Sequence, residues 1–153
     1  MTSILIALSI WLHNMGTLIL IGHYFLLSIL YIPALKNENR ILLSEISKRS
    51  RAWLYLALLI FALTGSYLTL VDPNYLGFAN FGNVWGVLML VKHLIIAGMI
   101  GLGFWFNAIL RVGPMMRSNS GGEQAAQRFA LYANLMAIAG VLVLLLTAIA
   151  QIE

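Results

Sequence analysis

Residues 85–110 decide the fold, because they read WGVLMLVKHLIIAGMIGLGFWFNAIL and contain only two ionisable side chains, Lys92 and His93. A helix that crosses the hydrocarbon of a bilayer needs roughly 20 mostly apolar residues. Three further stretches meet this requirement, at about residues 4–35, 53–71 and 129–149. The sequence therefore predicts a single transmembrane domain over residues 1–153, built from four helices.

The composition excludes an ordinary soluble globular protein. Apolar residues make up 61% of the chain, charged residues only 9%, and the mean hydropathy is +0.93. The first apolar run has no basic segment before it and no small-residue cleavage site, so we expect it to remain in the mature protein. Because the chain has no cysteine, disulfides and thiolate metal sites are excluded.

The basic residues predict the topology. Eight of the nine lie in or beside two connections, at Lys36, Arg40, Lys48, Arg49, Arg51, Arg111, Arg117 and Arg128. The connection at residues 72–83 has none, so the positive-inside rule places both basic connections in the cytoplasm and both termini outside. Short connections make neighbouring helices antiparallel. We expect an all-α, integral membrane up-down four-helix bundle, N-out/C-out, in the plasma (inner) membrane of a prokaryote.

Both kinds of connection have two interpretations. The first basic connection carries Ile41, Leu42, Leu43 and Ile46 among its charges, which suits either a positive-inside anchor or a short amphipathic helix on the inner surface. The outer connection, which follows a helix end at Asp72-Pro73, carries aromatic residues that suit a headgroup interface or a lid over a site: Tyr75, Phe78, Phe81 and Trp85.

Small residues form a second pattern. The third helix carries Ala97, Gly98, Gly101 and Gly103. Small side chains allow the close approach of a neighbouring helix, or of a flat ligand. Both interpretations stay open on the sequence alone.

Four ionisable side chains lie inside the apolar runs: His13, His23, Lys92 and His93. Such groups are rare in membrane helices and face the bundle interior or a water-filled cavity. For Lys92 the sequence allows an ammonium that reaches the outer headgroups, an anchor for an anion such as a haem propionate, or a neutral amine that binds a ligand or carries a proton.

The histidines predict a cofactor between the first and third helices. His13 and His23 are ten residues apart, about 15 Å along a helix, so they cannot hold one small ion together. Measured from the basic helix ends, His93 lies about 7–8 Å in height from each, and spacing does not choose its partner. One b-type haem with two axial imidazoles uses two facing helices best, with Gly16, Gly22, Ala97 and Gly101 beside the ring. The alternative is that each histidine hydrogen-bonds a neighbouring helix.

Copper is a second possible cofactor. Cu(I) favours methionine and histidine ligands. Met15 lies two residues from His13, and Met89 lies one turn before His93. These four side chains could form a cluster near the outer leaflet.

Several segments resemble the copper-resistance D (CopD)-like superfamily of four-helix membrane proteins. The first, WLHNMGTLILIGHYFLLSILYIPAL (residues 11–35), has the LH and the late proline of that family's first helix. TGSYLTL (residues 64–70) and WGVLMLVKHLIIAGMIGLGFWFNAILR (residues 85–111) continue the resemblance over nearly the whole chain. The layout is also similar to membrane haem-containing protoporphyrinogen oxidases, where a first-helix histidine and a later lysine matter for haem and activity. That likeness implies His13 and Lys92.

The chain departs from these families at two points. His23 and His93 are additional histidines, and Ala34 follows Pro33 where the oxidases commonly carry an arginine. The departures weaken an assignment as an oxidase and favour haem ligation.

We therefore expect an integral membrane b-type haem protein that takes part in electron transfer. It would act alone, as a homo-oligomer, or as a small subunit of a larger membrane redox complex, with lipid and not nucleic acid around it. If it is an enzyme, we expect a membrane oxidoreductase, because no nucleophile–base set or paired intramembrane carboxylates support hydrolysis. The alternatives are copper transport or resistance, and a non-catalytic structural subunit.

Overall fold

A computed structural model of the chain describes residues 2–35, 40–77, 82–106, 112–117 and 120–152, and in these ranges it contains helices and no strand. The four long helical segments are α1 (Thr2–Leu26) with its continuations η1 (Leu27–Tyr31) and α2 (Ile32–Leu35), α3 (Arg40–Val71), α4 (Val84–Phe104) and α6 (Gly122–Ala150). A short helix, α5 (Val112–Met115), precedes α6. All four long segments are apolar and long enough to cross a membrane, so the protein is an integral membrane four-helix bundle.

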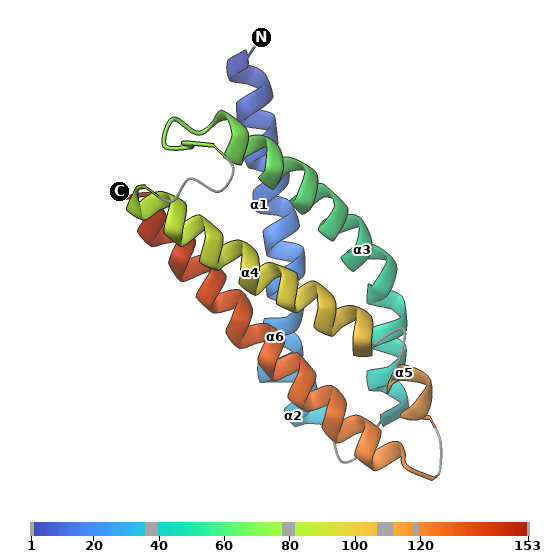
Figure 1. Cartoon of the computed structure of the whole chain (residues 1–153). Helices are drawn as coiled ribbons and strands as arrows, with labels where there is room; N and C mark the ends of the chain where they lie inside the picture. Colours follow the sequence, from blue (N-terminus) through green and yellow to red (C-terminus); the bar gives the residue numbers. More distant parts are fainter. Residues whose placement is uncertain (1, 36–39, 78–81, 107–111, 118–119, 153) are drawn as a thin grey trace.

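The helices run up and down as the short connections predict. In Figure 1 the start of α1, the end of α6 and the connection from α3 to α4 lie at one end of the bundle, and α2 and α5 lie at the other. Helix α1 packs on α3 and on α6, and α4 packs on α6. Helices α3 and α4 make few close contacts with each other in the described part of the chain.

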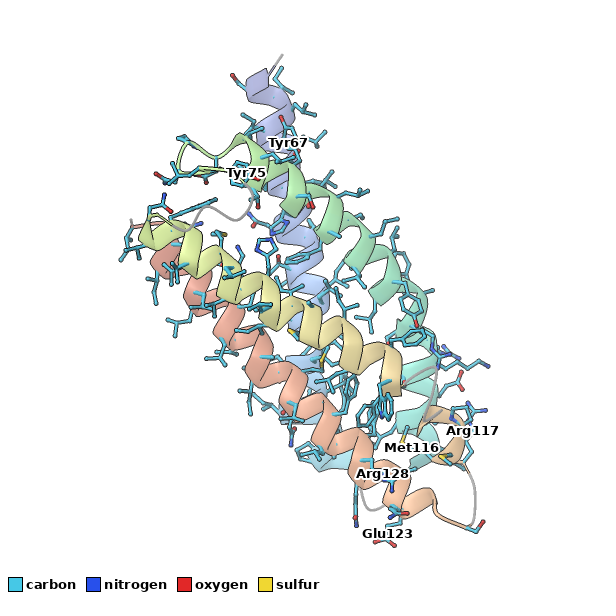
Figure 2. All side chains as sticks on the ribbon, in the orientation of Figure 1. Tyr67, Tyr75, Met116, Arg117, Glu123 and Arg128 are labelled. Carbon is cyan, nitrogen blue, oxygen red and sulfur yellow. The ribbon has the colours of Figure 1, made fainter. Side chains whose placement is uncertain are left out.

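The two ends differ chemically. Figure 2 shows Tyr67 and Tyr75 at the end that carries the termini, and Arg117, Glu123 and Arg128 at the opposite end. We call these the aromatic end and the basic end. An aromatic belt at one interface and cationic loops at the other are the features that anchor membrane proteins.

The predicted helices are confirmed, with shifted boundaries. The third helix begins at Val84, after an N-cap in which the Asn83 side chain accepts the Gly86 N–H at 2.8 Å. Its predicted last residues, 107–110, lie outside the described ranges. The fourth helix begins at Gly122, seven residues before the predicted start. Gly121, which adopts φ +84°, precedes the first turn of α6. From Gly122 onward the polar residues and the apolar run form one continuous helix.

The last turns of the first segment form a π-helix because of a proline. Pro33 has no N–H, and its ring would clash with the carbonyl four residues before it in a regular α-helix. The preceding turn widens, so that the Ile32 N–H bonds to the Leu27 carbonyl five residues back. In this segment the Ser28 hydroxyl donates to Asn134 Oδ1 of α6 at 2.6 Å, which joins the two helices.

Helix α3 is longer than the second helix predicted from sequence. Its 32 residues span about 48 Å, against a hydrocarbon thickness of about 30 Å. Residues 41–52 continue the transmembrane helix, so a separate amphipathic helix on the inner surface is not formed. These residues carry the basic anchor directly on α3.

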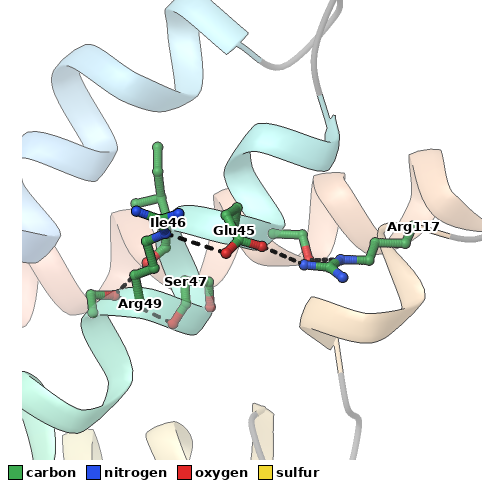
Figure 3. Close-up of polar contacts among 7 residues, drawn as sticks. Glu45, Ile46, Ser47, Arg49 and Arg117 are labelled. Carbon is green, nitrogen blue, oxygen red and sulfur yellow. Dashed lines mark hydrogen bonds and ion pairs between the residues drawn. The ribbon is translucent and has the colours of Figure 1, made fainter.

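An ion-pair network fixes the connection before α6 to the start of α3. Figure 3 shows Glu45 between Arg49 and Arg117. Arg117 donates to Glu45 Oε2 at 2.7 Å and to Ser44 Oγ at 3.0 Å, and Arg49 donates to Glu45 Oε1 at 3.3 Å. Met116 and Leu43, next to these residues in the sequence, belong to the same buried cluster, and each is about 1% exposed.

The packed core lies in the half of the bundle nearer the basic end. It contains Tyr24, Leu27, Leu43, Met116, Phe129, Tyr132 and Met136, with alanines of α6 between them. The Tyr24 and Tyr132 hydroxyls share a 2.7 Å hydrogen bond, and the Phe106 ring stacks on Tyr132 at 4.5 Å. The half nearer the aromatic end has no such cluster among the described residues, and the larger cavity lies there.

Of the four small residues of α4, only Gly103 lies close to a neighbouring helix, since a Cβ there would lie 3.3 Å from the Tyr132 hydroxyl of α6. Ala97, Gly98 and Gly101 are exposed, and a Cβ added at Gly98 or Gly101 would meet nothing within 4 Å. Close helix contacts occur instead at Gly16 and Gly140. A Cβ there would lie 3.2 Å from the Ala57 carbonyl oxygen of α3 and 2.9 Å from Ile21 of α1, respectively.

Candidate functional site

A cavity of about 800 Å³ lies among α1, α3, α4 and α6 near the aromatic end, and we call it the outer cavity. His13, Lys92 and His93 all contribute to its wall. Other polar side chains in the wall come from the adjacent helix ends: Asn14, Ser66, Thr69, Asp72, Asn74, Thr147 and Gln151. Its size falls within the usual range of about 300–1,000 Å³ for small-molecule sites.

His13 is held in one orientation by α3. Its ring stacks on Phe61 with centroids 4.3 Å apart and planes 24° apart. Its Nδ1 lies 3.0 Å from Thr64 Oγ1, whose own proton goes to the Ile60 carbonyl at 2.7 Å. Because the hydroxyl proton is already used, Thr64 accepts, and the proton of this hydrogen bond belongs to Nδ1 of His13.

A glycine makes this arrangement possible. A Cβ at Gly65 would lie 3.0 Å from His13 Cε1, closer than side chains normally approach. The imidazole therefore occupies space that only Gly65 leaves free on that side of α3.

His93 is oriented by its own helix. Its Nδ1 lies 2.6 Å from the Met89 carbonyl oxygen, and a carbonyl can only accept. The Nδ1 of His93 therefore carries a proton, as does that of His13. In a neutral imidazole with Nδ1 protonated, Nε2 holds a free lone pair. Both histidines of the outer cavity thus have the tautomer that a metal ligand needs.

The cavity distinguishes the two histidines of the first helix, which spacing left equal as neighbours of His93. His13 lines the outer cavity with His93, whereas His23 does not. The sequence estimate measured heights from the basic residues that follow the helices. It could not include the π-helical turn of the first segment or the crossing of α1 over α4 and α6 that Figure 1 shows.

Lys92 is half-buried in the wall of the outer cavity. The sequence showed no acidic residue deep in a run, but Asp72, just beyond the end of α3, lines the same cavity. The Asp72 carboxylate accepts the Asn74 N–H at 2.9 Å, which shapes the connection at the cavity rim. The first residues of this connection therefore border the site; Phe78 and Phe81, named in the predicted lid, lie outside the described ranges.

A second cavity, of about 200 Å³, lies toward the basic end, and we call it the inner cavity. Leu58, Phe61, Ile96 and Ile100 line both cavities and separate them. The inner cavity contains His23, whose ring meets Tyr24 edge-on at 5.4 Å. Its other polar wall residues are Thr17, Ser47, Ser50, Arg51, Tyr55 and Tyr132.

The copper candidates are only partly brought together. Met89 lines the outer cavity with His13 and His93, but Met15 is 37% exposed and does not belong to the cavity wall. Among the described residues, no group of three or more His, Asp or Glu side chains is placed to hold a metal ion.

Four small residues expected beside a porphyrin ring lie elsewhere. Gly16, Gly22, Ala97 and Gly101 line neither cavity, whereas Gly65 lines the outer one and Gly103 the inner one. The prediction failed because a count of small residues does not say which face of a helix they occupy. In the sequence analysis Thr64 and Gly65 belong only to the TGSYLTL segment that carries the family resemblance, and nothing in that segment indicates that they meet His13.

No family model, curated protein or solved structure matches this chain in comparisons with known proteins.

Proposed function

We propose that this protein is an integral membrane b-type haem protein that takes part in electron transfer, with His13 and His93 as the two axial ligands. The observation that carries the proposal is the pair of imidazoles on α1 and α4. They line one cavity, and each donates its Nδ1 proton and keeps its Nε2 lone pair. Ligating histidines are normally fixed in this way by a hydrogen bond at the other ring nitrogen.

The residues of the outer cavity fit a haem. The space is large enough for a cofactor, much of the wall is apolar, and two potential ligands come from different helices. Helices α3 and α4 make few close contacts with each other in the described part of the chain, which leaves room for a planar group between them. When bound, haem would supply one-electron redox chemistry.

The chain would supply position and electrostatics. Thr64 and Phe61 fix the ring of His13, and the Met89 carbonyl fixes that of His93. Lys92 provides a cation for a propionate at the end where the cavity is polar. A bis-histidine site leaves no open position on the metal, which favours electron transfer over oxygen chemistry.

Copper handling is the second candidate, and Met89 is the observation that favours it. Its side chain shares the cavity with two histidines, and Cu(I) accepts such a ligand set. The exposed position of Met15 removes one of the four ligands that the sequence suggested. Haem therefore uses the geometry better than copper does.

We further propose that the basic end faces the cytoplasm of a prokaryotic cell, in the plasma membrane. Figure 2 shows Arg117 and Arg128 at that end, and Arg49 lies there too, because Glu45 accepts hydrogen bonds from both Arg49 and Arg117. Cytoplasmic loops carry an excess of such residues. The protein would exchange electrons with partners on its own, as a homo-oligomer, or as a subunit of a larger complex.

The test is an absorbance spectrum of the purified protein before and after dithionite, together with metal analysis. Haem ligated by two histidines gives a Soret band and a sharp alpha band on reduction, with iron and without copper. A protein with no such bands that carries stoichiometric copper would replace the haem proposal by the copper one.

A further inference from the structure

The inner cavity contains an arginine whose buried nitrogen lacks an acceptor. Arg51 lies on α3 in the cavity wall, and its Nε is inaccessible to solvent, with no hydrogen-bond partner among the described residues. More than 90% of buried polar groups in proteins find a partner in the protein or in ordered water. An unpaired N–H on a charged guanidinium is therefore a feature that calls for an acceptor in the cavity.

The surroundings define the charge of that acceptor. The described residues of the inner cavity wall include Arg51 and His23 but no aspartate or glutamate. A guanidinium binds oxyanions most strongly, often through two parallel hydrogen bonds. A carboxylate or a phosphate satisfies these donors better than a neutral oxygen does.

The inner cavity is polar on the side nearer the basic end and mostly apolar on the side nearer the aromatic end. Ser47, Ser50, Arg51 and Tyr55 come from two successive turns of α3, about 20 residues or 30 Å of helix before Val71. That distance equals the thickness of the hydrocarbon layer, so these groups lie at headgroup depth on the basic side. Beyond them the wall is mostly apolar and includes Leu20, Leu58, Ile96 and Met99, and the one hydroxyl that the described residues place on this side, that of Thr17, is bonded to the His13 carbonyl. A ligand that fits both parts has an anionic head and an apolar body.

The volume limits the size of the body. A cavity of 150 Å³ accommodates a benzene molecule, and the inner cavity measures about 200 Å³. It therefore has room for part of one acyl chain, and a ligand with two chains would have to leave its glycerol and its second chain outside the cavity.

We propose that the inner cavity is a binding site for a single-chain fatty carboxylate, whose head is held by Arg51 with His23 and whose chain extends along α3 and α4 toward Ile96. His23 is suited to a second contact because no hydrogen bond to its ring occurs among the described residues; its neighbour Tyr24 is bonded to Tyr132 instead. This site is separate from the outer cavity and does not depend on haem.

The experiment uses the full-length protein in discs of phosphatidylcholine, at alkaline pH, with a photoactivatable palmitate as the probe. Cross-linking is followed by peptide mass spectrometry, and unlabelled palmitate, methyl palmitate, phosphatidylglycerol and inorganic phosphate are added as competitors. We expect label on residues of the inner cavity, competed by palmitate and not by the ester, by phosphatidylglycerol or by free phosphate.

Arg51→Gln should weaken the apparent affinity about tenfold to a hundredfold, since it removes a charge-assisted hydrogen bond. Arg49→Gln is the matched control, because that side chain is 82% exposed and bonds only to Glu45 in the described part of the chain. We expect Arg51→Lys, which keeps the charge and loses the fork of N–H donors, to have an intermediate effect and to guard against a folding defect in Arg51→Gln.

Equal labelling of Arg51→Gln and wild type would overturn the proposal, as would competition by methyl palmitate. Competition by phosphatidylglycerol as strong as that by palmitate would assign the site to a phospholipid headgroup and reject the single-chain ligand. Competition by inorganic phosphate alone would reject the apolar part of the site.

Discussion

The residue-scale feature on which the proposed haem site depends is the proton on each Nδ1. For His13 the argument depends on Thr64, whose hydroxyl proton is committed to its own helix and whose oxygen therefore accepts. For His93 the acceptor is a backbone carbonyl, which no side-chain substitution removes. The two proposed ligands are thus oriented by different means, and only the orientation of His13 can be tested by changing its hydrogen-bond partner.

Thr64→Val removes the acceptor of His13 Nδ1 and keeps the shape of the side chain. We expect haem affinity to fall about 10- to 100-fold, which is the usual cost of removing the hydrogen-bond partner of a metal-ligating histidine. The loss of affinity is measured as the haem-to-protein ratio after dialysis against apomyoglobin. Thr147→Val is the matched control: that hydroxyl also lines the outer cavity but bonds only to the Val143 carbonyl in the described structure. Equal haem retention by both variants would contradict the role of Thr64.

Gly65→Ala tests the space beside His13. The added Cβ would lie 3.0 Å from Cε1, so the ring must shift by a few tenths of an ångström while Phe61 and Thr64 hold it. We expect a lower haem content and a changed alpha band. Gly98→Ala makes the same substitution where nothing lies within 4 Å, and it should leave the spectrum unchanged. An unchanged spectrum in Gly65→Ala would show that the imidazole is not confined there.

At the scale of elements, the sequence predicted the four helices well because apolar length is a strong signal. It also predicted that α3 ends before Asp72-Pro73, and α3 does end at Val71. The sequence did not predict the length of α3. Residues 41–52, taken without the apolar run that follows them, have the pattern of a surface helix, but they form one helix with that run. The π-helical turn before Pro33 and the early start of α6 were missed for a similar reason, since local composition does not fix a helix boundary.

The sequence predicted which residues form the candidate site, but it did not predict which two histidines share a cavity. His13, Lys92 and His93 were identified because ionisable groups are costly in an apolar helix. Whether they share a cavity depends on the relative heights and rotations of their helices. Both change when one helix gains a π turn. The resemblance to the CopD-like superfamily remains a prediction.

Among the glycines of the described structure, Gly140 leaves the least room for an added Cβ. A Cβ there would lie 2.9 Å from Ile21 Cγ2, and Ile21 is itself buried. Gly140→Ala should force α1 and α6 apart and lower the unfolding temperature in detergent by several degrees, despite the better helix propensity of alanine, about 1 kcal/mol. Gly101→Ala, which meets nothing within 4 Å, should not lower it. A Gly140→Ala protein as stable as wild type would show that this crossing is loosely packed.

At the scale of the whole molecule, the separation of charge defines an orientation that can be measured directly. The chain has no cysteine, so single cysteines can be introduced without a background. Asn74 lies at the aromatic end and Gln124 at the basic end, and both are exposed. In intact cells we expect a membrane-impermeant maleimide to label Asn74→Cys and not Gln124→Cys. The reverse labelling pattern would place the basic end outside and contradict the proposed topology.

The bundle as a whole is well packed at the basic end and open at the aromatic end, as a scaffold that holds a cofactor in its outer half would be. The most direct test of this account is the haem content of three purified variants, His13→Ala, His23→Ala and His93→Ala, measured as pyridine haemochrome beside the wild type. Wild type and His23→Ala should retain about one haem per chain, while His13→Ala and His93→Ala lose it. No haem in the wild type, or loss in His23→Ala with retention in His13→Ala, would contradict the pairing of His13 with His93.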